Sequence, residues 1–107
     1  MRTPKIELIF DADCPNVEQA RAHLRAALES AGLAVPWSEW DRASPSAPRQ
    51  LQRYASPTVL VNGTDVAGES ELSGGIGCRV YASAGGVQGA PPPEMILRAL
   101  SVACHAT

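Results

Sequence analysis

Residues 6–17, IELIFDADCPNV, decide the expected fold of this chain. The run over 6–10 is short, apolar and rich in β-branched and aromatic residues, and it stops at Asp-Ala-Asp, as a largely buried strand would. Pro15 suits the first position of a helix, where its missing N–H costs nothing, and Cys14 then becomes the expected N-cap residue. We therefore predict a strand that turns at Cys14-Pro15 into a helix over residues 15–31, ended by Gly32.

The rest of the chain is expected to form short elements between turns. They are a strand over residues 33–40, one or two helical turns over 49–54, two strands over 58–61 and 64–66, a short strand over 78–81, and a helix after the Pro-Pro-Pro of 91–93. The strand over 33–40 is expected at a sheet edge, because Pro36 cannot donate a ladder hydrogen bond. Asn62-Gly63 predicts a hairpin, and the polar, Gly-rich stretch over 68–77 predicts a long exposed loop or lid.

Several conspicuous side chains have plain structural interpretations. Trp37 and Trp40 have opposite parity on one predicted strand, so they cannot form one aromatic platform and at least one belongs to the core. His23 lies between polar neighbours in the first helix and is expected to be solvated. Cys104 and His105 fall in the last turn of the chain and are interpreted as a dispensable tail.

Length, charge and cysteine count narrow the class of protein. The chain has 107 residues, 45% of them hydrophobic, and fits a single domain over 1–107. A formal net charge of −2 without a cationic run argues against nucleic acid or an anionic membrane as partner. The apolar run near the amino terminus is too brief for a signal-peptide core or a membrane span, which predicts a cytoplasmic protein. Three widely spaced cysteines indicate free thiols rather than a disulfide framework or a zinc site, and no cofactor is expected.

The expected order of elements, with a thiol at the first strand-to-helix turn, resembles the thioredoxin fold. The resemblance rests on Cys14-Pro15-Asn16-Val17, which looks like the family's active-site turn, and on Ser56-Pro57-Thr58-Val59, which looks like its cis-proline turn. It implies an α/β fold of order β-α-β-α-β-β-α, with a central mixed sheet flanked by helices. It also implies that Pro57 is cis and lies close to Cys14. Val17 departs from the family pattern, since it stands where the C-x-x-C motif has its second cysteine.

A narrower resemblance is to a group of small bacterial thioredoxin-like proteins. Some members carry selenocysteine at the first of these cysteines, and some carry an alkylmercury-lyase label. The shared features are Cys14-Pro15, the Ser-Pro-Thr-Val-Leu-Val-Asn-Gly-Thr-Asp segment over 56–65, and Cys78-Arg79-Val80-Tyr81, with Gly89-Ala90-Pro91 following. This resemblance implies a thiol-dependent role and no particular substrate.

Cys14 is the predicted nucleophile. As an N-cap residue it would lie against the free N–H groups of Asn16 and Val17 and the positive end of the helix dipole, and both favour a thiolate. The carboxylates of Asp11 and Asp13 would oppose a second anion nearby. Because it precedes a proline at a strand-to-helix turn, we expect the Cys14 thiol to be exposed; the alternative is a partly buried, inert cysteine that caps the helix.

Cys78 and the cis-proline turn complete the predicted site. Cys78 follows a Gly-rich loop that could carry it toward Cys14, as a resolving thiol or a second soft-metal ligand, or it is a small strand residue facing the core. The resemblance implies that the backbone of Ser56 and Thr58, on either side of Pro57, pairs with an extended substrate. Pro15 and Asn16 belong to the same predicted substrate-binding set.

Three functions are compatible with these features. In the first, a thiol-disulfide oxidoreductase or peroxidase-like protein uses Cys14 to attack a small disulfide, a peroxide or a partner protein, and Cys78 or an external thiol resolves the product. In the second, both cysteines bind Hg(II) or Cu(I), and Asp11 or Asp13 protonates a carbon–mercury bond. In the third, the chain is a non-catalytic scaffold that binds a protein partner through residues 68–77 or a sheet edge.

Overall fold

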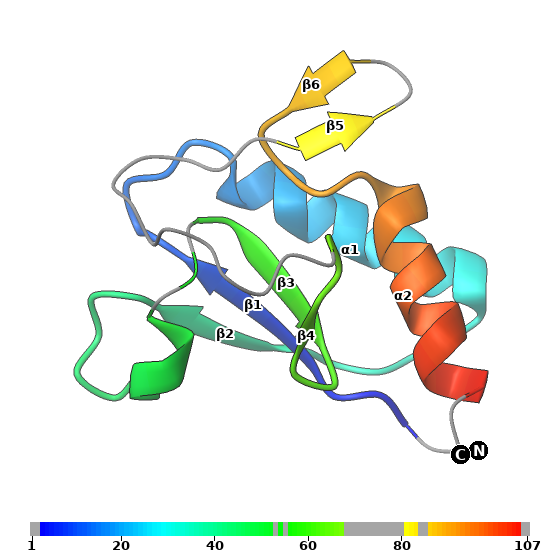
Figure 1. Cartoon of the computed structure of the whole chain (residues 1–107), viewed down its shortest axis with the longest axis horizontal. Coiled ribbons are helices and arrows are strands. Elements are labelled where there is room, and N and C mark those ends of the chain that lie inside the picture. Colours follow the sequence, from blue (N-terminus) through cyan, green and yellow to red (C-terminus); the bar gives the residue numbers. More distant parts are fainter. Residues whose placement is uncertain (1–2, 53, 55, 68–80, 84–85, 106–107) are drawn as a thin grey trace.

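The computed structural model describes residues 3–52, 54, 56–67, 81–83 and 86–105. It is an α/β structure that combines a four-stranded mixed sheet with helices α1 and α2 (Figure 1). The elements are β1 (Ile6–Phe10), α1 (Val17–Ala31), β2 (Ser38–Asp41), the 3₁₀ turn η1 (Arg49–Leu51), β3 (Thr58–Val61), β4 (Thr64–Asp65), β5 (Tyr81–Ser83), β6 (Gly86–Gln88) and α2 (Pro93–His105). Within the described residues, neither helix is long and apolar enough to cross a membrane.

The sheet has the strand order β2-β1-β3-β4. β2 lies at the edge, as Pro36 predicts, and runs parallel to β1 with Trp40 beside Ile9. β3 runs antiparallel to β1, with Thr58 opposite Ile9. The end of β1 and the start of β3 therefore lie side by side, which brings the turn after β1 next to the Ser56-Pro57 segment. β5 and β6 pair in a separate antiparallel ribbon.

Alternate residues of the central strands pack on opposite faces of the sheet, as the two-residue period of a strand requires. Ile6, Leu8, Val59 and Val61 face the helices and form the helix-side core with apolar residues of α1 and α2. The helix residues of this core are Val17, Ala20, Leu24, Ala27, Leu28, Ile96 and Leu100. Figure 1 shows α1 and α2 together beside the sheet.

The second face of the sheet carries a smaller apolar cluster. It consists of Ile9, Leu51, Tyr54 and Leu60, with Trp40 packed against it. The predicted helical turns over 49–54 are shorter than expected, because η1 ends at Leu51. Among the described residues, this face is thus covered by a 3₁₀ turn and Tyr54, whereas the expectation was a sheet flanked by helices.

The hairpin between β3 and β4 confirms the Asn62-Gly63 prediction. Asn62 has a φ of 54° and Gly63 a φ of 82°, the pair of positive values that a type I′ turn requires. The Asn62 side chain also accepts a hydrogen bond from the Lys5 N–H at 2.8 Å. This hydrogen bond therefore joins the turn to Lys5, the residue directly before β1.

One boundary differs from its prediction because the chain needs extra residues to leave α1. β2 begins at Ser38 rather than 33, since the Leu33 N–H still caps α1 through the Leu28 carbonyl at 2.9 Å. The predicted loop over 68–77 and residues 78–80 of the predicted strand over 78–81, Cys78 among them, lie outside the described residues, and Tyr81 belongs to β5.

The two tryptophans lie on opposite faces of the sheet, and His23 is hydrogen-bonded to the chain before α2. Trp37 packs against the helix-side core and Trp40 against the second-face cluster, which confirms that they point to opposite faces. The prediction of a merely solvated His23 is wrong. Its Nδ1 lies 2.9 Å from the Pro91 carbonyl in a half-buried position, because the chain entering α2 passes along α1 there.

Candidate functional site

The turn after β1 positions Cys14. The Cys14 N–H donates a hydrogen bond to the Asp11 carbonyl at 2.9 Å, which closes a tight turn over residues 11–14. The Cys14 residue is only 9% exposed and belongs to the helix-side core together with Val17 and Ala90. The expectation of an exposed thiol is therefore wrong, because the turn directs this side chain inward against α1 and the residues before α2.

Cys14 is also not the N-cap of α1. The helix begins at Val17 with Asn16 as its N-cap, and the Asn16 carbonyl accepts the first helical hydrogen bond from the Ala20 N–H at 3.0 Å. Pro15 lies outside the helix because the closed turn over residues 11–14 comes first. The thiol thus precedes the first helical turn, and the influence of the helix dipole falls off within that turn.

The cis-proline segment is bonded to the same turn. The Ser56–Pro57 peptide bond is cis, as predicted. The Ser56 hydroxyl accepts a hydrogen bond from the Asp11 N–H at 2.9 Å. A continuous path, from Ser56 through the two backbone groups of Asp11 to the Cys14 N–H, therefore joins the two motifs that the sequence singled out.

Burial limits access to this path. Ser56 and Thr58 are each 0% exposed, and Pro57 is fully buried. Pro15 is exposed and Asn16 half-buried, so these two present the only solvent contact within the predicted substrate-binding set. An extended substrate would reach the backbone of Ser56 or Thr58 only after neighbouring residues moved.

Sequence reasoning missed Arg42, which organises the electrostatics of the site. Its Nη1 lies 2.9 Å from Asp11 Oδ2, and its Nε and Nη2 each approach the Gln52 carbonyl at 3.3 Å. The Arg42 N–H also donates to the Phe10 carbonyl at 2.8 Å. A basic residue directly after β2, the parallel neighbour of β1, was the available signal, because parallel strands end at the same edge of the sheet.

The Arg42–Asp11 pair changes the expected charge balance at Cys14. Asp11 and Asp13 were both predicted to oppose a thiolate, but the Asp11 charge is compensated by the guanidinium, and Asp13 is exposed to solvent, where screening is strong. Arg42 thus binds the carboxylate of Asp11, which is one of the two acids considered for protonating a carbon–mercury bond. Among the described residues, no group of three or more His, Cys, Asp or Glu side chains is arranged to hold a metal ion.

Cys78 lies outside the described residues, so the distance between its sulfur and that of Cys14 is not part of this geometry.

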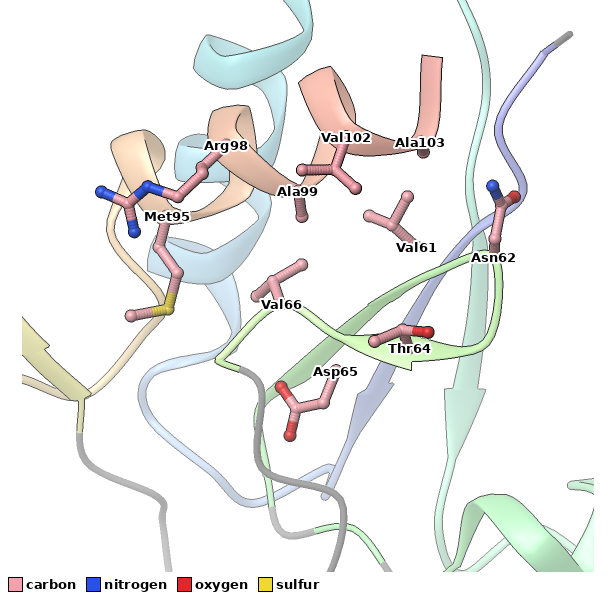
Figure 2. Close-up of a pocket in the computed structure, with 10 residues that line it drawn as sticks. All are labelled: Val61, Asn62, Thr64, Asp65, Val66, Met95, Arg98, Ala99, Val102 and Ala103. Atoms are coloured by element: carbon pink, nitrogen blue, oxygen red, sulfur yellow. The ribbon is translucent and has the colours of Figure 1, made fainter. Parts of the chain in front are cut away.

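A cavity of about 390 Å³ lies elsewhere, between the β3–β4 hairpin and α2. Figure 2 shows Val61 and Val66 of the hairpin facing Ala99 and Val102 of the helix, with Arg98 at one end. None of the predicted site residues that the structure describes lines it. Its largely apolar lining suits burial of an apolar group, and it has no part in the thiol chemistry expected of Cys14.

In comparisons with known proteins, no protein-family model, curated protein or solved structure matches the chain.

Proposed function

We propose that this chain is a thiol-dependent redox protein of thioredoxin-like fold, in which Cys14 is the attacking residue. The observation that carries the proposal is the hydrogen-bonded path from Ser56 through Asp11 to the Cys14 N–H. It brings a Cys-Pro turn and a cis-proline turn together at adjacent strand ends, as the resemblance implies. The mixed sheet, the β1-α1-β2 unit and the antiparallel β3–β4 hairpin support the same assignment.

The proposed reaction is thiol–disulfide exchange. The Cys14 thiolate attacks one sulfur of a small disulfide, the S–S bond breaks, and the departing thiolate takes up a proton. Because Val17 replaces a second active-site cysteine, the mixed disulfide on Cys14 has no attacker one helical turn away. Resolution then comes from the Cys78 thiolate, which forms a Cys14–Cys78 disulfide and releases the second substrate thiol, or from an external thiol.

A non-catalytic scaffold is the second candidate, and the burial of the site favours it. A cysteine 9% exposed, beside fully buried Ser56 and Thr58, has the surroundings of a core residue. The two candidates differ in one measurable property, which is whether the Cys14 thiol reacts in the native state or only after unfolding.

The deciding experiment measures the rate at which oxidised glutathione modifies Cys14 as urea is raised below the unfolding midpoint. A Cys78→Ser, Cys104→Ser double variant leaves Cys14 as the single thiol, and mass spectrometry counts the adduct. A redox thiol reacts through native fluctuations, so we expect a rate nearly independent of urea. A rate that rises in parallel with the unfolded fraction would contradict the proposal and favour the scaffold.

The role of Cys78 has its own test. In the chain that retains Cys78, we expect the mixed disulfide at Cys14 to be short-lived, and Cys78→Ala should prolong its lifetime. Replacing Val17 by Cys in the Cys78→Ala background should restore fast release. Equal adduct lifetimes with and without Cys78 would remove it from the mechanism and leave a monothiol protein that depends on an external reductant.

A further inference from the structure

A second pocket lies on the face of the sheet opposite the helices, near the amino-terminal end of β1. It has a volume of about 370 Å³, and its lining includes Glu7, Trp40, Tyr54 and Leu60. The pocket exists because η1 covers this face only in part. Cys14 follows the other end of β1, so the two sites are separate.

Glu7 is the unusual member of this pocket. It is 6% exposed and is the second residue of β1, between Leu60 of β3 and Ser38 of β2. Its Oε2 accepts a hydrogen bond from Trp40 Nε1 at 3.0 Å. Within the described part of the chain, no group donates a hydrogen bond to its Oε1.

Among the described residues, the cation that pairs with Glu7 is weakly engaged. Lys5 Nζ lies 4.0 Å from Glu7 Oε2, at the limit of an ion pair, and its side chain is 73% exposed. Such a pair contributes little, because water and salt screen it and the lysine loses side-chain freedom in making it. Among the described residues, Oε1 accepts no hydrogen bond, and it is not one of the fully buried side-chain atoms without a partner, so it keeps contact with solvent. Oε1 can therefore accept one further donor.

We propose that this pocket binds a small organic ammonium ion. Its N–H donates to Glu7 Oε1, and its apolar or aromatic body packs against Trp40 and Leu60. A charge-assisted hydrogen bond to a carboxylate is stronger than a neutral one, and an aromatic wall adds a favourable interaction with the cation. The volume lies in the range of small-ligand sites, and the lining mixes an apolar wall with polar groups, among them the mostly exposed side chain of Lys5.

The charge of Glu7 selects against other ligand classes. An anionic ligand would place a second negative charge beside a buried carboxylate. A divalent metal ion needs several oxygen ligands, and the described residues present no group of three candidate ligands anywhere. An ammonium ion needs one carboxylate oxygen and an apolar wall, both of which this pocket has.

The two tryptophans make the test specific. Each indole N–H donates to a glutamate, Trp40 to Glu7 inside the pocket and Trp37 to Glu39 at 2.9 Å outside it. The proton-nitrogen NMR signal of the Trp40 indole therefore reports on the pocket, and that of Trp37 serves as an internal control. Trp37→Phe assigns the two signals.

Benzylammonium is the probe, with benzyl alcohol as its neutral counterpart and benzoate as its anionic one. We expect benzylammonium to shift the Trp40 signal saturably and to leave the Trp37 signal in place. The two counterparts should bind about tenfold more weakly or not at all. Equal binding of benzyl alcohol, or no saturable shift of the Trp40 signal, would overturn the proposal.

Two variants complete the experiment. Glu7→Gln keeps an oxygen for the Trp40 indole and removes the charge, so it should weaken benzylammonium binding about tenfold, whereas Glu39→Gln should not change it. If Glu7→Gln does not fold, the comparison of benzylammonium with benzyl alcohol on the original chain decides, because the preference for the ammonium ion depends on the Glu7 charge. Unchanged binding in Glu7→Gln, or equal binding of the two probes, would overturn the assignment of Glu7.

Discussion

Asn16 occupies the N-cap position of α1, yet its side chain makes no capping hydrogen bond. The amide lies against Gly89 instead, where an ideal Cβ would be 2.3 Å from Asn16 Nδ2 and 2.4 Å from Asn16 Cγ. A side chain at position 89 and the present Asn16 conformer therefore exclude each other. Asn16 lies two residues after Cys14, and this contact joins the site to the segment that leads into α2.

The contact predicts a coupled pair of substitutions. Gly89→Ala should lower the free energy of unfolding by about 1 kcal/mol, because the new methyl group forces the half-buried Asn16 amide into another conformer. The same substitution in an Asn16→Ala background should cost much less, since the amide is gone. Urea unfolding of the four proteins in this double-mutant cycle measures the coupling, and additive effects would contradict the contact.

Arg21 and Glu39 join helix α1 to strand β2. Arg21 Nη2 lies 2.8 Å from Glu39 Oε1 and Arg21 Nε 2.9 Å from Glu39 Oε2, so the pair is bidentate, and Arg21 also contacts Glu18. The hydrogen bond from Arg21 holds the pKa of Glu39 below its ordinary value of 4.5, with the Trp37 indole acting in the same direction and burial opposing both. The hydrogen bond to Glu39 likewise raises the pKa of Arg21 above its ordinary value.

The lowered pKa of Glu39 predicts how stability depends on pH. A carboxyl whose pKa is lower in the folded state than in the unfolded one stabilises the fold above the unfolded pKa, and this contribution is lost as the pH falls through the folded pKa. Between about pH 5 and pH 3, the chain with Glu39 should therefore lose more stability than Glu39→Gln.

Urea unfolding across this pH range measures the effect. Glu18→Gln is the matched control, because the Glu18 side chain is 83% exposed and its pair with Arg21 should contribute little. Parallel pH profiles for the original chain and Glu39→Gln would contradict the prediction. At neutral pH, Glu39→Gln should cost about 1 kcal/mol or less, as expected for a partly exposed pair.

The whole molecule has two unequal apolar layers. On the helix side, α1 and α2 enclose residues such as Leu24, which is 0% exposed. On the second face, Leu51 is 8% exposed and lines the Glu7 pocket, so that one side of its side chain already lacks close-packed neighbours. The helix side therefore accounts for most of the packing that stabilises the fold.

This asymmetry predicts different costs for the same substitution. Leu24→Ala should lower the free energy of unfolding by about 2–5 kcal/mol, because it leaves a cavity in a filled core. Leu51→Ala should cost clearly less, since it enlarges a pocket that is already open. Urea unfolding monitored by circular dichroism measures both, and a cost for Leu51→Ala equal to or above that for Leu24→Ala would show that the second face is equally important.

The sequence by itself determined the elements whose signals are local. The apolar run of β1, the period of α1, the Asn62-Gly63 hairpin and the edge position of β2 each depend on neighbours a few residues apart, and the structure confirms them. The cis bond at Pro57 was predicted through the resemblance. The start of α1 was predicted wrongly, because Cys14 and Asn16 can both precede a helix and the Asp11–Cys14 turn selects Asn16.

Only the tertiary structure decided what surrounds these elements. The hydrogen bond from Asp11 to Ser56 spans 45 residues, the Arg42–Asp11 pair 31 and the Trp40–Glu7 hydrogen bond 33. Each depends on which strands are neighbours and in what register, and a one-residue slip would send every side chain to the other face. For the same reason, the burial of Cys14 and the position of Glu7 inside a pocket follow from strand order and sheet coverage, which local sequence patterns do not encode.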